Sequence, residues 1–257
     1  MTKHARDFSI VKKTFLSAAH FLLELSSSEP LPPIVPGQFC EVLIPHSAQT
    51  FLRRPFSIHD VIEETNSIII QVSIVGAGTQ QLSRLTEGQS LNTIFPLGKG
   101  FSLAEKGRVL LAGGGCGTAP LLYLARLLYE KNVRLDILTG GRCFSDIHET
   151  HEYRKYGELY ISTEDGSLGE KGIITKHSIL NGMPAYDMVY CCGPEPMMKA
   201  VAAWCAGHNT ECEVSLENTM ACGIGACLCC VTSTNQGNAC VCTEGPVFNT
   251  KQLLWQT

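Results

Sequence analysis

Short β-forming segments separated by turns fill the first hundred residues of the chain. Most of them are bounded by glycine, proline or polar residues, and they lie at 8–12, 21–25, 39–44, 57–62, 67–74 and 90–94. A proline-rich stretch at 30–36 is expected to form a loop between two of them. Regular short strands with turn signals between them are typical of a closed antiparallel barrel. This pattern predicts a β-barrel domain over residues 1–101.

The pattern changes at Arg108, where strands and helices begin to alternate. Apolar strands are expected at 108–111, 134–139, 158–163 and 188–191, with helices at 121–129 and 196–206. Strands that alternate with helices predict a doubly wound parallel α/β sheet, which we assign to residues 102–210. From 211 to 257 the chain is rich in cysteine, glycine and asparagine without a strong period. A small separate module is expected there.

Composition narrows the classes of function. The chain has 257 residues, is 44% hydrophobic and carries a formal charge of −4, which gives no basic surface for nucleic acid. No apolar run approaches the ~18 residues of a membrane span. The 13 cysteines, without a secretory signal, indicate a reducing compartment. We therefore expect a cytoplasmic protein that binds neither nucleic acid nor a membrane.

Four cysteines near the C-terminus carry the most specific chemical signal. Three of them stand as C-x4-C-x2-C and the fourth follows after eleven residues: Cys222, Cys227, Cys230 and Cys242. This is the ligand spacing of a plant-type 2Fe-2S cluster. Gly223 and Gly225 lie between the first two cysteines, and glycines can take the positive φ that brings backbone N–H groups against the sulfurs. The spacing predicts that these four thiolates hold the two irons.

Other interpretations of the cysteines stay open. Cys240 and Cys242 could complete a four-thiolate zinc site with Cys227 and Cys230, in which case the protein would be a non-catalytic interaction module. Such a site would leave Cys222 and its small-residue loop without a role. A disulfide framework is disfavoured because the number of cysteines, 13, is odd. We expect Cys229 and Cys240 to pack as small apolar residues and not to bind the cluster.

Two glycine-containing turns are expected at the carboxyl ends of sheet strands. The first contains Gly114, Gly115 and Gly117, and the second contains Gly193 and Pro194. N–H groups at a helix N-terminus bind anions, and doubly wound sheets bind ligands at this edge. The turns therefore predict a pyrophosphate site for a nucleotide. Tight packing of strand on helix is the alternative, because the first turn lacks the Rossmann fingerprint.

Two stretches of the barrel are candidate phosphate sites. The run Arg-Pro-Phe-Ser begins at Arg54, and a guanidinium can pair with a phosphate through a planar fork. Gly78 and Thr79 lie where a second glycine-containing segment enters a short helix at 80–85. On its own, the arginine run is also typical of a solvated basic turn.

The order of these motifs resembles a known family. Arg-Pro-Phe-Ser and Gly-x-Gly-Thr in a barrel, followed by GGGxGxAP and CGPxPMM in an α/β region, resemble the ferredoxin–NAD(P) reductase superfamily. The C-terminal MACGIGAC segment with VCTEGPVF is similar to the electron-transfer subunit of type 1B dihydroorotate dehydrogenase. The resemblance extends from about residue 8 to residue 252.

This resemblance implies three cofactors: FAD on the barrel, NAD on the sheet and a 2Fe-2S cluster in the C-terminal segment. A flavin can exchange electrons both with a two-electron nicotinamide and with a one-electron cluster. Hydride transfer requires no acid–base side chain, so no catalytic residue is assigned. The resemblance places Arg54 on the FAD pyrophosphate and Ser57 near the isoalloxazine. The implied FAD contacts are Arg54, Pro55, Phe56, Ser57, Ile70, Gln71, Val72, Gly78 and Thr79.

The resemblance also implies a partner subunit. That subunit would carry FMN and oxidise dihydroorotate to orotate in pyrimidine biosynthesis, within a heterotetramer of two plus two chains. Electrons would pass from its FMN through the cluster and FAD to NAD. A stand-alone NAD(P)H-dependent reductase serving an oxygenase or a hydrogenase is the alternative, since it would use the same cofactors.

The segment after the second sheet strand favours NAD over NADP. Arg142 is the only basic residue in it, whereas the 2′-phosphate of NADP calls for basic groups. Asp146 lies four residues further on and would repel that phosphate if it faces the same pocket. Alternatively, Arg142 and Asp146 form an exposed ion pair that contacts no ligand.

Overall fold

The computed structural model describes residues 2–47, 49–181 and 185–255. Its contacts divide the chain into two compact units. The barrel unit comprises Met1–Gly100, Asn218–Thr232 and Ala239–Pro246, and the sheet unit comprises Phe101–Glu217, Ser233–Asn238 and Val247–Thr257. The segment from 211 to 257, expected as a module of its own, is thus shared between the two.

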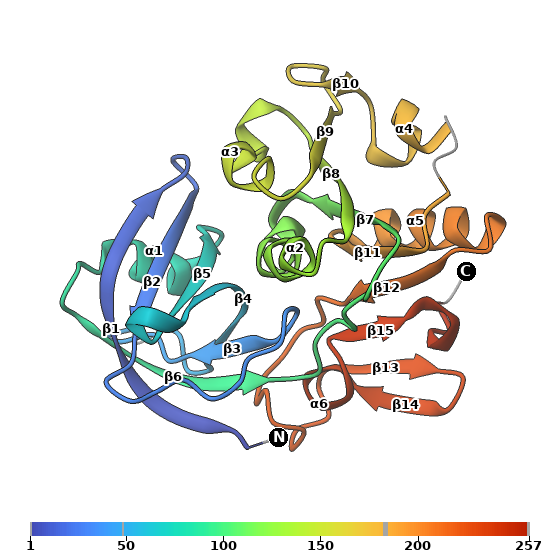
Figure 1. Cartoon of the computed structure of the whole chain (residues 1–257). Coiled ribbons are helices and arrows are strands. Elements are labelled where there is room, and N and C mark those ends of the chain that lie inside the picture. The colour runs from blue at the N-terminus through green and yellow to red at the C-terminus, as the bar shows by residue number, and fades with distance from the viewer. Residues whose placement is uncertain (1, 48, 182–184, 256–257) are drawn as a thin grey trace. The chain divides into compact units, whose positions relative to one another are not determined.

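The barrel unit contains the predicted closed antiparallel barrel, with strand order β1-β2-β5-β4-β3-β6. Every neighbouring pair is antiparallel, including β1 with β6, which closes the barrel (Figure 1). A short helix, α1 (Ala77–Arg84), connects β5 to β6. The six strands are β1 (His4–Phe15), β2 (His20–Ser26), β3 (Phe39–Val42), β4 (Arg54–Ile62), β5 (Ser67–Ser73) and β6 (Ser90–Leu97).

Along the barrel strands, buried apolar side chains that alternate with more exposed ones form the barrel core. Along β2, Phe21, Leu23 and Leu25 are fully buried, and the residues between them are partly exposed. Phe8 of β1 meets Phe95 of β6 edge to face, with ring centroids 4.8 Å apart. The inward positions are thus apolar around the closure of the barrel.

The sheet unit contains a seven-stranded sheet of order β10-β9-β8-β7-β11-β12-β15. All neighbouring strands are parallel except β15, which is antiparallel to β12. The pattern predicted four of these strands and missed β10, β12 and β15. The seven strands are β7 (Arg108–Gly114), β8 (Arg134–Gly141), β9 (Glu158–Thr163), β10 (Glu170–Lys171), β11 (Met188–Cys192), β12 (Glu211–Ser215) and β15 (Val247–Asn249).

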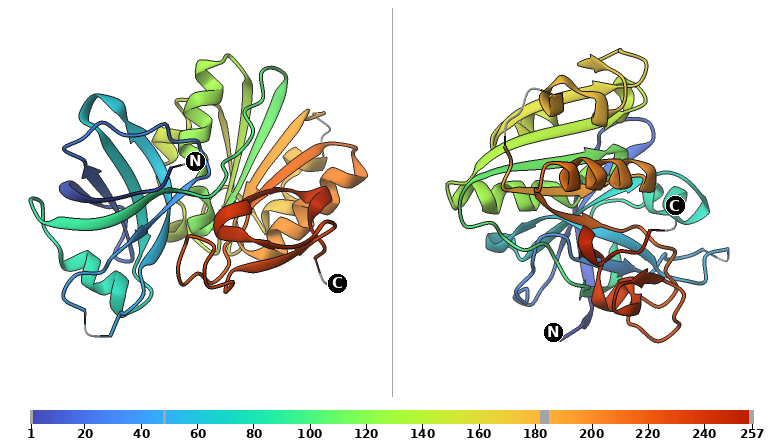
Figure 2. Two further views of the ribbon diagram at one scale, coloured as in Figure 1. Left: turned by 90° about the horizontal axis from the view of Figure 1, so that it is seen from below. Right: turned by 90° about the vertical axis from the view of Figure 1, so that its right-hand side faces the viewer.

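Helices cover both faces of this sheet. In Figure 1, α2 (Leu121–Glu130) and α3 (Thr150–Tyr153) lie on one face, and α4 (Ser178–Asn181) and α5 (Glu195–Gly207) lie on the other. Right-handed crossovers that run in opposite directions from the middle of a sheet produce this arrangement. The order in which strands are added reverses between the parallel neighbours β7 and β11, which Figure 2 shows as a jump from green to orange between neighbouring strands. Doubly wound sheets bind ligands at such a reversal.

The core of the sheet unit forms under α2. Leu121, Leu124 and Leu128 of this helix are buried against Val109 and Ile137 of the two central strands. Short 3-10 turns complete the unit: η2 (Gly115–Thr118), η3 (Phe144–Asp146), η4 (Ile174–Lys176) and η5 (Thr250–Gln252).

Three further elements lie between β12 and β15 in the sequence. They are a hairpin of β13 (Val231–Thr234) and β14 (Gly237–Cys240), followed by α6 (Val241–Glu244). A further 3-10 turn, η1 (Glu63–Thr65), joins β4 to β5. None of the helices in the described ranges has the length and apolarity needed to span a membrane.

Candidate cofactor sites

Two adjacent arginines at the entry to β4 have different partners. Arg53 donates from Nη1 to the carbonyl of Asn92 at 2.8 Å and from Nη2 to its side-chain oxygen at 2.5 Å, so its guanidinium is bound within the barrel unit. Arg54 donates from Nη1 to the carbonyls of Leu52 and Arg53, at 2.9 and 3.2 Å. Among the described residues, the Nε and Nη2 groups of Arg54 have no such partner. Arg54 is therefore the arginine that can pair with an anion.

The other predicted flavin contacts on the strands differ in accessibility. Pro55 is exposed, while Phe56 and Ser57 are partly buried. Ile70 and Val72 on β5 are fully buried in the barrel core, and Gln71 between them points to the opposite side. The Nε2 of Gln71 is buried without a hydrogen-bond partner in the part of the chain that the structure describes. The side-chain amide of Gln71 is therefore available to a ligand bound beside β5, whereas Ile70 and Val72 have no polar side-chain group to offer.

Gly78 and Thr79 form the first turn of α1. The Thr79 hydroxyl accepts from the N–H groups of Val75 and Gly76, at 2.9 and 3.2 Å, so it caps the helix. A Cβ on Gly78 would lie 3.3 Å from the Cγ2 of Thr50, which makes this a position of close approach. The turn presents backbone N–H groups, and Thr79 orients that turn.

Backbone amides surround the predicted cluster ligands in the barrel unit. The Sγ of Cys222 accepts from the N–H groups of Ala226 and Cys227, at 3.3 and 3.4 Å. The Sγ of Cys230 accepts from the N–H of Cys242 at 3.3 Å. Burial raises the pKa of the Cys222 thiol, but backbone hydrogen bonds, led by that of Ile224, outweigh it and lower the pKa to about 6. Sulfurs held by N–H donors suit thiolates that bind iron.

Glycine is required at two places in the cluster loop. Gly223 and Gly225 have φ values of +64° and +86°, as the sequence predicted. A Cβ on Gly223 would lie 2.6 Å from the Cγ of Glu41 on β3. Glu41 is fully buried there, and within the described residues its carboxylate oxygens have no hydrogen-bond partner. Burial raises the pKa of Glu41 to about 7, against the opposing effect of Arg53.

Two further thiols of this segment were not expected to bind the cluster. Burial and then the charges of Cys230, Glu244, Cys227 and Cys222 raise the pKa of Cys240. Cys229 is exposed, and its N–H donates to the Sγ of Cys227 at 3.5 Å. Among the described residues, no three His, Cys, Asp or Glu side chains are grouped to hold one metal ion. That finding does not count against a 2Fe-2S cluster, in which each iron takes two protein ligands.

The two glycine turns of the sheet unit pack against each other. A Cβ on Gly114 would lie 2.5 Å from the Sδ of Met197 on α5, and one on Gly117 would lie 2.4 Å from the carbonyl of Cys192. Gly193 has a φ of +154°, and a Cβ there would lie 2.6 Å from the Cε of Met197. Close packing therefore accounts for these three glycines. Gly115, with a φ of +54°, has nothing within 4 Å of such a Cβ and lies open.

A buried tyrosine supports the first glycine turn. Tyr153 on α3 is 1% exposed, and its hydroxyl donates to the carbonyl of Thr118 at 2.8 Å. The Thr118 hydroxyl in turn donates to the carbonyl of Gly115 at 3.0 Å. With these carbonyls bound, the turn can present N–H groups to an anion. This role could not be predicted from the sequence, because Tyr153 lies far from the turn along the chain.

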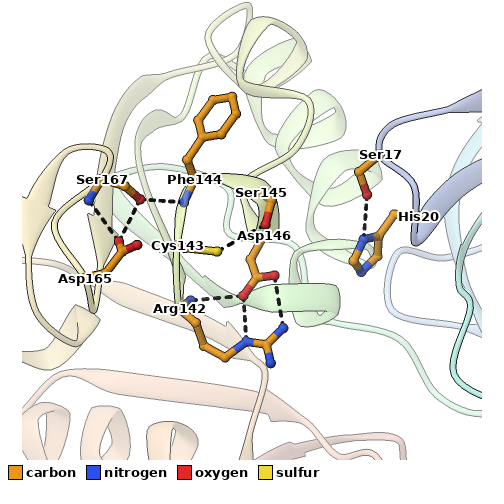
Figure 3. Close-up of polar contacts among 9 residues, drawn as sticks. All are labelled: Ser17, His20, Arg142, Cys143, Phe144, Ser145, Asp146, Asp165 and Ser167. Carbon is orange, nitrogen blue, oxygen red and sulfur yellow. Dashed lines mark hydrogen bonds and ion pairs between the residues drawn. The ribbon is translucent and has the colours of Figure 1, made fainter.

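The loop after β8 carries the nucleotide-choice residues. Arg142 donates from Nε and Nη2 to the two carboxylate oxygens of Asp146, at 2.8 and 3.1 Å, and its backbone N–H also donates to Asp146 (Figure 3). Asp146 and nearby acids raise the pKa of the Arg142 guanidinium. The buried Oγ1 of Thr139 near the end of β8 has no partner among the described residues. The Arg142–Asp146 ion pair is thus formed at the edge of the sheet where a nucleotide would bind.

Comparison with protein families agrees with this division of sites. Residues 217–254 match the iron-sulfur cluster binding domain of dihydroorotate dehydrogenase B. Residues 111–203 match the oxidoreductase NAD-binding domain. The first range holds the cysteine loop, and the second holds the glycine turns and the loop after β8.

Individual relatives cover nearly the whole chain. The dihydroorotate dehydrogenase B (NAD(+)) electron transfer subunit of Caldanaerobacter subterraneus subsp. tengcongensis is 42% identical over 86% of this chain and 87% of its own length. The subunit of the same name from Shouchella clausii is 35% identical over 99% of this chain and 100% of its own. The chain belongs to this family of electron-transfer subunits. It is therefore an oxidoreductase subunit, and the name of the family implies a catalytic partner.

Solved structures support the fold of this electron-transfer subunit. An NADH-dependent reduced ferredoxin–NADP oxidoreductase, studied for flavin-based electron bifurcation, superposes with a TM-score of 0.87 and 27% identity over 96% of this chain and 90% of that one. A ferredoxin reductase of carbazole 1,9a-dioxygenase gives a TM-score of 0.70 over 82% of this chain and 67% of its own, at 18% identity. The second likeness concerns the fold alone.

Proposed function

We propose that this protein transfers electrons between a dihydroorotate-oxidising FMN subunit and NAD, within a dihydroorotate dehydrogenase of the B type. When bound, the flavin exchanges electrons in pairs with the nicotinamide and singly with the cluster. One observation carries the proposal most directly. The amide-held cysteines and the available Arg54 belong to the same barrel unit, while the sheet unit carries the NAD-binding domain match.

The residues in the barrel unit have distinct proposed roles. Arg54 pairs with the FAD pyrophosphate, the amides at Gly78 and Thr79 approach its phosphates, and Ser57 lies near the isoalloxazine. Pro55, Phe56 and the β5 residues Ile70, Gln71 and Val72 shape the flavin site, and Gln71 supplies its amide. Cys222, Cys227, Cys230 and Cys242 hold the cluster.

In the sheet unit, the two glycine turns form the pyrophosphate site. Gly115 lies open at the first turn, and Gly114, Gly117, Gly193 and Pro194 allow the two turns to approach each other. The order in which strands are added to the sheet reverses between the parallel strands β7 and β11, at a point between these turns, where a doubly wound sheet binds a dinucleotide.

The partner is proposed to be an FMN-containing catalytic subunit, in a heterotetramer of two copies of each chain. Ile224 and Leu228 next to the cluster ligands are exposed apolar side chains, as expected of a surface that another protein covers. We place the complex in the cytoplasm, because none of the 13 cysteines forms a disulfide in the structure.

Reconstitution with the partner tests the proposal. The chain would be produced with the FMN subunit from the same host, and dihydroorotate-dependent reduction of NAD would be measured for the complex and for each chain alone. We expect activity only in the complex. We expect the isolated chain to contain FAD and iron and to pass electrons from NADH to a dye. The Arg54→Ala chain, depleted of FAD, is the matched control and should restore little activity.

The alternative is a reductase that serves an oxygenase or a hydrogenase. It would be favoured if the chain oxidised NADH but gave no dihydroorotate activity with the FMN subunit. Purification from the native host with an oxygenase or hydrogenase component in place of that subunit would decide for it.

A further inference from the structure

An exposed aromatic side chain stands at the carboxyl edge of the sheet. Phe144 is the first residue of η3, just after β8 ends at Gly141, and it is 64% exposed. β8 lies next to β7, whose carboxyl end carries the open glycine turn. The Phe144 ring and the glycine turn thus follow neighbouring parallel strands at the same edge.

The backbone beneath this ring is anchored. The N–H of Phe144 donates to the Oγ of Ser167 at 2.7 Å, and Ser167 donates to Asp165 from its hydroxyl and its N–H, at 2.6 and 2.9 Å (Figure 3). These residues lie in the loop after β9, the next strand of the sheet. The N–H of Ile147 donates to the carbonyl of Phe144 at 3.1 Å. The ring is therefore exposed on a fixed support.

The neighbouring residues indicate what the ring faces. In doubly wound sheets the first glycine turn holds the pyrophosphate, and an acidic residue after the following strand lies at the adenosine ribose. Asp146 occupies that place here, two residues after Phe144 and bonded to Arg142. The adenosine half of a dinucleotide would then extend over the loop after β8.

We propose that Phe144 is the adenine platform of this protein: the adenine ring of NAD stacks on the phenyl ring of Phe144. The proposal rests on the proposed NAD-dependent function. Stacking needs only a π-face and no hydrogen bonds, and a stacked base is stabilised substantially by one aromatic ring. The bond to Ser167 keeps the backbone that carries the ring in place before the nucleotide arrives, which reduces the ordering cost of binding.

The test compares two hydride donors that differ in the adenylate half. The FAD-loaded protein and its Phe144→Ala and Phe144→Trp variants would be assayed with NADH and with reduced nicotinamide mononucleotide, using a dye as acceptor. For Phe144→Ala we expect KM for NADH to rise about tenfold or more with kcat little changed. For reduced nicotinamide mononucleotide we expect no change. Phe144→Trp should keep the wild-type KM for NADH.

Tyr129 provides the matched control. It is a 54% exposed aromatic near the carboxyl end of α2, a helix that returns from the glycine turn toward the opposite edge of the sheet. Tyr129→Ala should leave both donors unaffected. Calorimetric titration with ADP-ribose, which contains adenine without nicotinamide, should show the same loss of affinity for Phe144→Ala as the kinetics.

Each contrary result has a definite meaning. Equal KM values for NADH in wild type and Phe144→Ala would overturn the proposal. Equal losses with both donors would overturn it too, because the ring would then support the whole site and not the adenine. A wild-type protein that uses the two donors equally well would refute adenine recognition but leave the NAD-dependent function standing. A wild-type protein that oxidises neither donor would refute that function itself.

Discussion

At the scale of single residues, side chains that are adjacent in sequence differ in what they can bind. Arg53 donates hydrogen bonds to Asn92 and to the carbonyl of Glu41, while the hydrogen bonds of Arg54 within the described residues go to carbonyls of its own turn. A pair of arginines in a sequence does not reveal which one is used internally. The hydrogen bonds make that distinction and give it a testable form.

Arg54→Ala should weaken FAD binding by roughly ten- to a hundredfold, because a charge-assisted contact to a phosphate contributes ~1.5–3 kcal/mol. The measurement is the FAD content after dialysis and the dissociation constant on reconstitution. Arg53→Ala is the control. It should lower the midpoint of thermal unfolding and leave the FAD content of the folded protein unchanged. Equal FAD content in wild type and Arg54→Ala would reject the assignment.

Asp146→Asn should shift nucleotide choice toward NADPH. In the native protein the Asp146 carboxylate binds the Arg142 guanidinium at two points, which withholds it from a 2′-phosphate. The neutral amide frees Arg142, so we expect the ratio of kcat/KM for NADPH to that for NADH to rise about tenfold.

Asp165→Asn is the control for this change, because the Asp165 carboxylate binds Ser167, and its contact with Arg142 is between backbone atoms that the substitution keeps. It should leave the ratio nearly as it is in wild type. An unchanged ratio in Asp146→Asn would mean that the ion pair contacts no nucleotide.

At the scale of elements, the glycine turn depends on a helix that is distant in sequence. The hydroxyl of Tyr153 on α3 holds the carbonyl of Thr118 in the turn. Tyr153→Phe keeps the buried ring and removes this bond, leaving a buried carbonyl unsatisfied at a cost of ~1–3 kcal/mol. We expect KM for NADH to rise several-fold with kcat little affected. Tyr156→Phe, three residues beyond the end of α3, should change neither.

An unaltered KM in Tyr153→Phe, with only a lower midpoint of thermal unfolding, would limit Tyr153 to a structural role. Slower hydrogen exchange of the amides of the turn in wild type than in the variant would support positioning.

The edge of the sheet near β10 should be sensitive to acid. His177 is buried, its Nδ1 accepts from the N–H of Ile179, and its Nε2 lies 3.4 Å from Glu170. Burial lowers the pKa of His177 below its ordinary 6.5, against the opposing charge of Glu170; Tyr160 is the other titratable side chain against it. A lowered pKa means that the stabilisation exists above about pH 6.5 and is lost as the pH falls through the folded-state value.

His177→Asn tests this expectation, since its side-chain oxygen can accept the same N–H without titrating near neutrality. The wild-type free energy of unfolding should fall between pH 6.5 and 5 relative to that of the variant, by at most ~1.4 kcal/mol per pH unit for one proton. The measurement is denaturant titration of both proteins at several pH values. If the free energies of unfolding of wild type and variant changed with pH in the same way, this expectation would be contradicted.

The elements that could be predicted from the sequence are those whose run of apolar or β-forming residues is long enough to show a pattern. The six barrel strands and the four central sheet strands met that condition. β10 has two residues and β15 has three, too few for any alternation. β12 lies at the start of the cysteine-rich segment, and the composition of that segment is not typical of a strand. The cysteine spacing and the positive φ of Gly223 and Gly225 were predictable, because cluster geometry imposes them locally.

What the sequence could not supply depends on contacts between distant segments. The bonds from Tyr153 to Thr118 and from Phe144 to Ser167 join residues that no short motif connects. The packing of Gly114 and Gly117 against α5 and β11 also appears only when the two turns meet in space. A glycine in a motif therefore indicated a close approach but did not say to what.

At the scale of the whole molecule, the cluster loop makes its contacts within the barrel unit. The N–H of Lys99 donates to the carbonyl of Gly245 at 2.5 Å, and the Nζ of Lys3 donates to the carbonyl of Ile224 at 3.1 Å. Glu41 on β3 lies against Gly223. Barrel strands and cluster loop thus share contacts, so loss of the cluster should be felt by the flavin-binding barrel.

Replacing each cluster ligand should destabilise the barrel unit selectively. Metal binding contributes to folding where its ligands come from a loop with few buried side chains. Serine at position 222, 227, 230 or 242 should abolish the iron and the reduced-state EPR signal, lower the temperature at which FAD is released, and leave ADP-ribose binding by the sheet unit within about twofold of wild type.

Alanine at Cys229 or Cys240 should leave the iron content unchanged. Loss of the cluster in Cys229→Ala with retention in Cys230→Ala would show that the ligand assignment is shifted by one residue. An unchanged temperature of FAD release in all four serine variants would show that the cluster loop does not support the barrel.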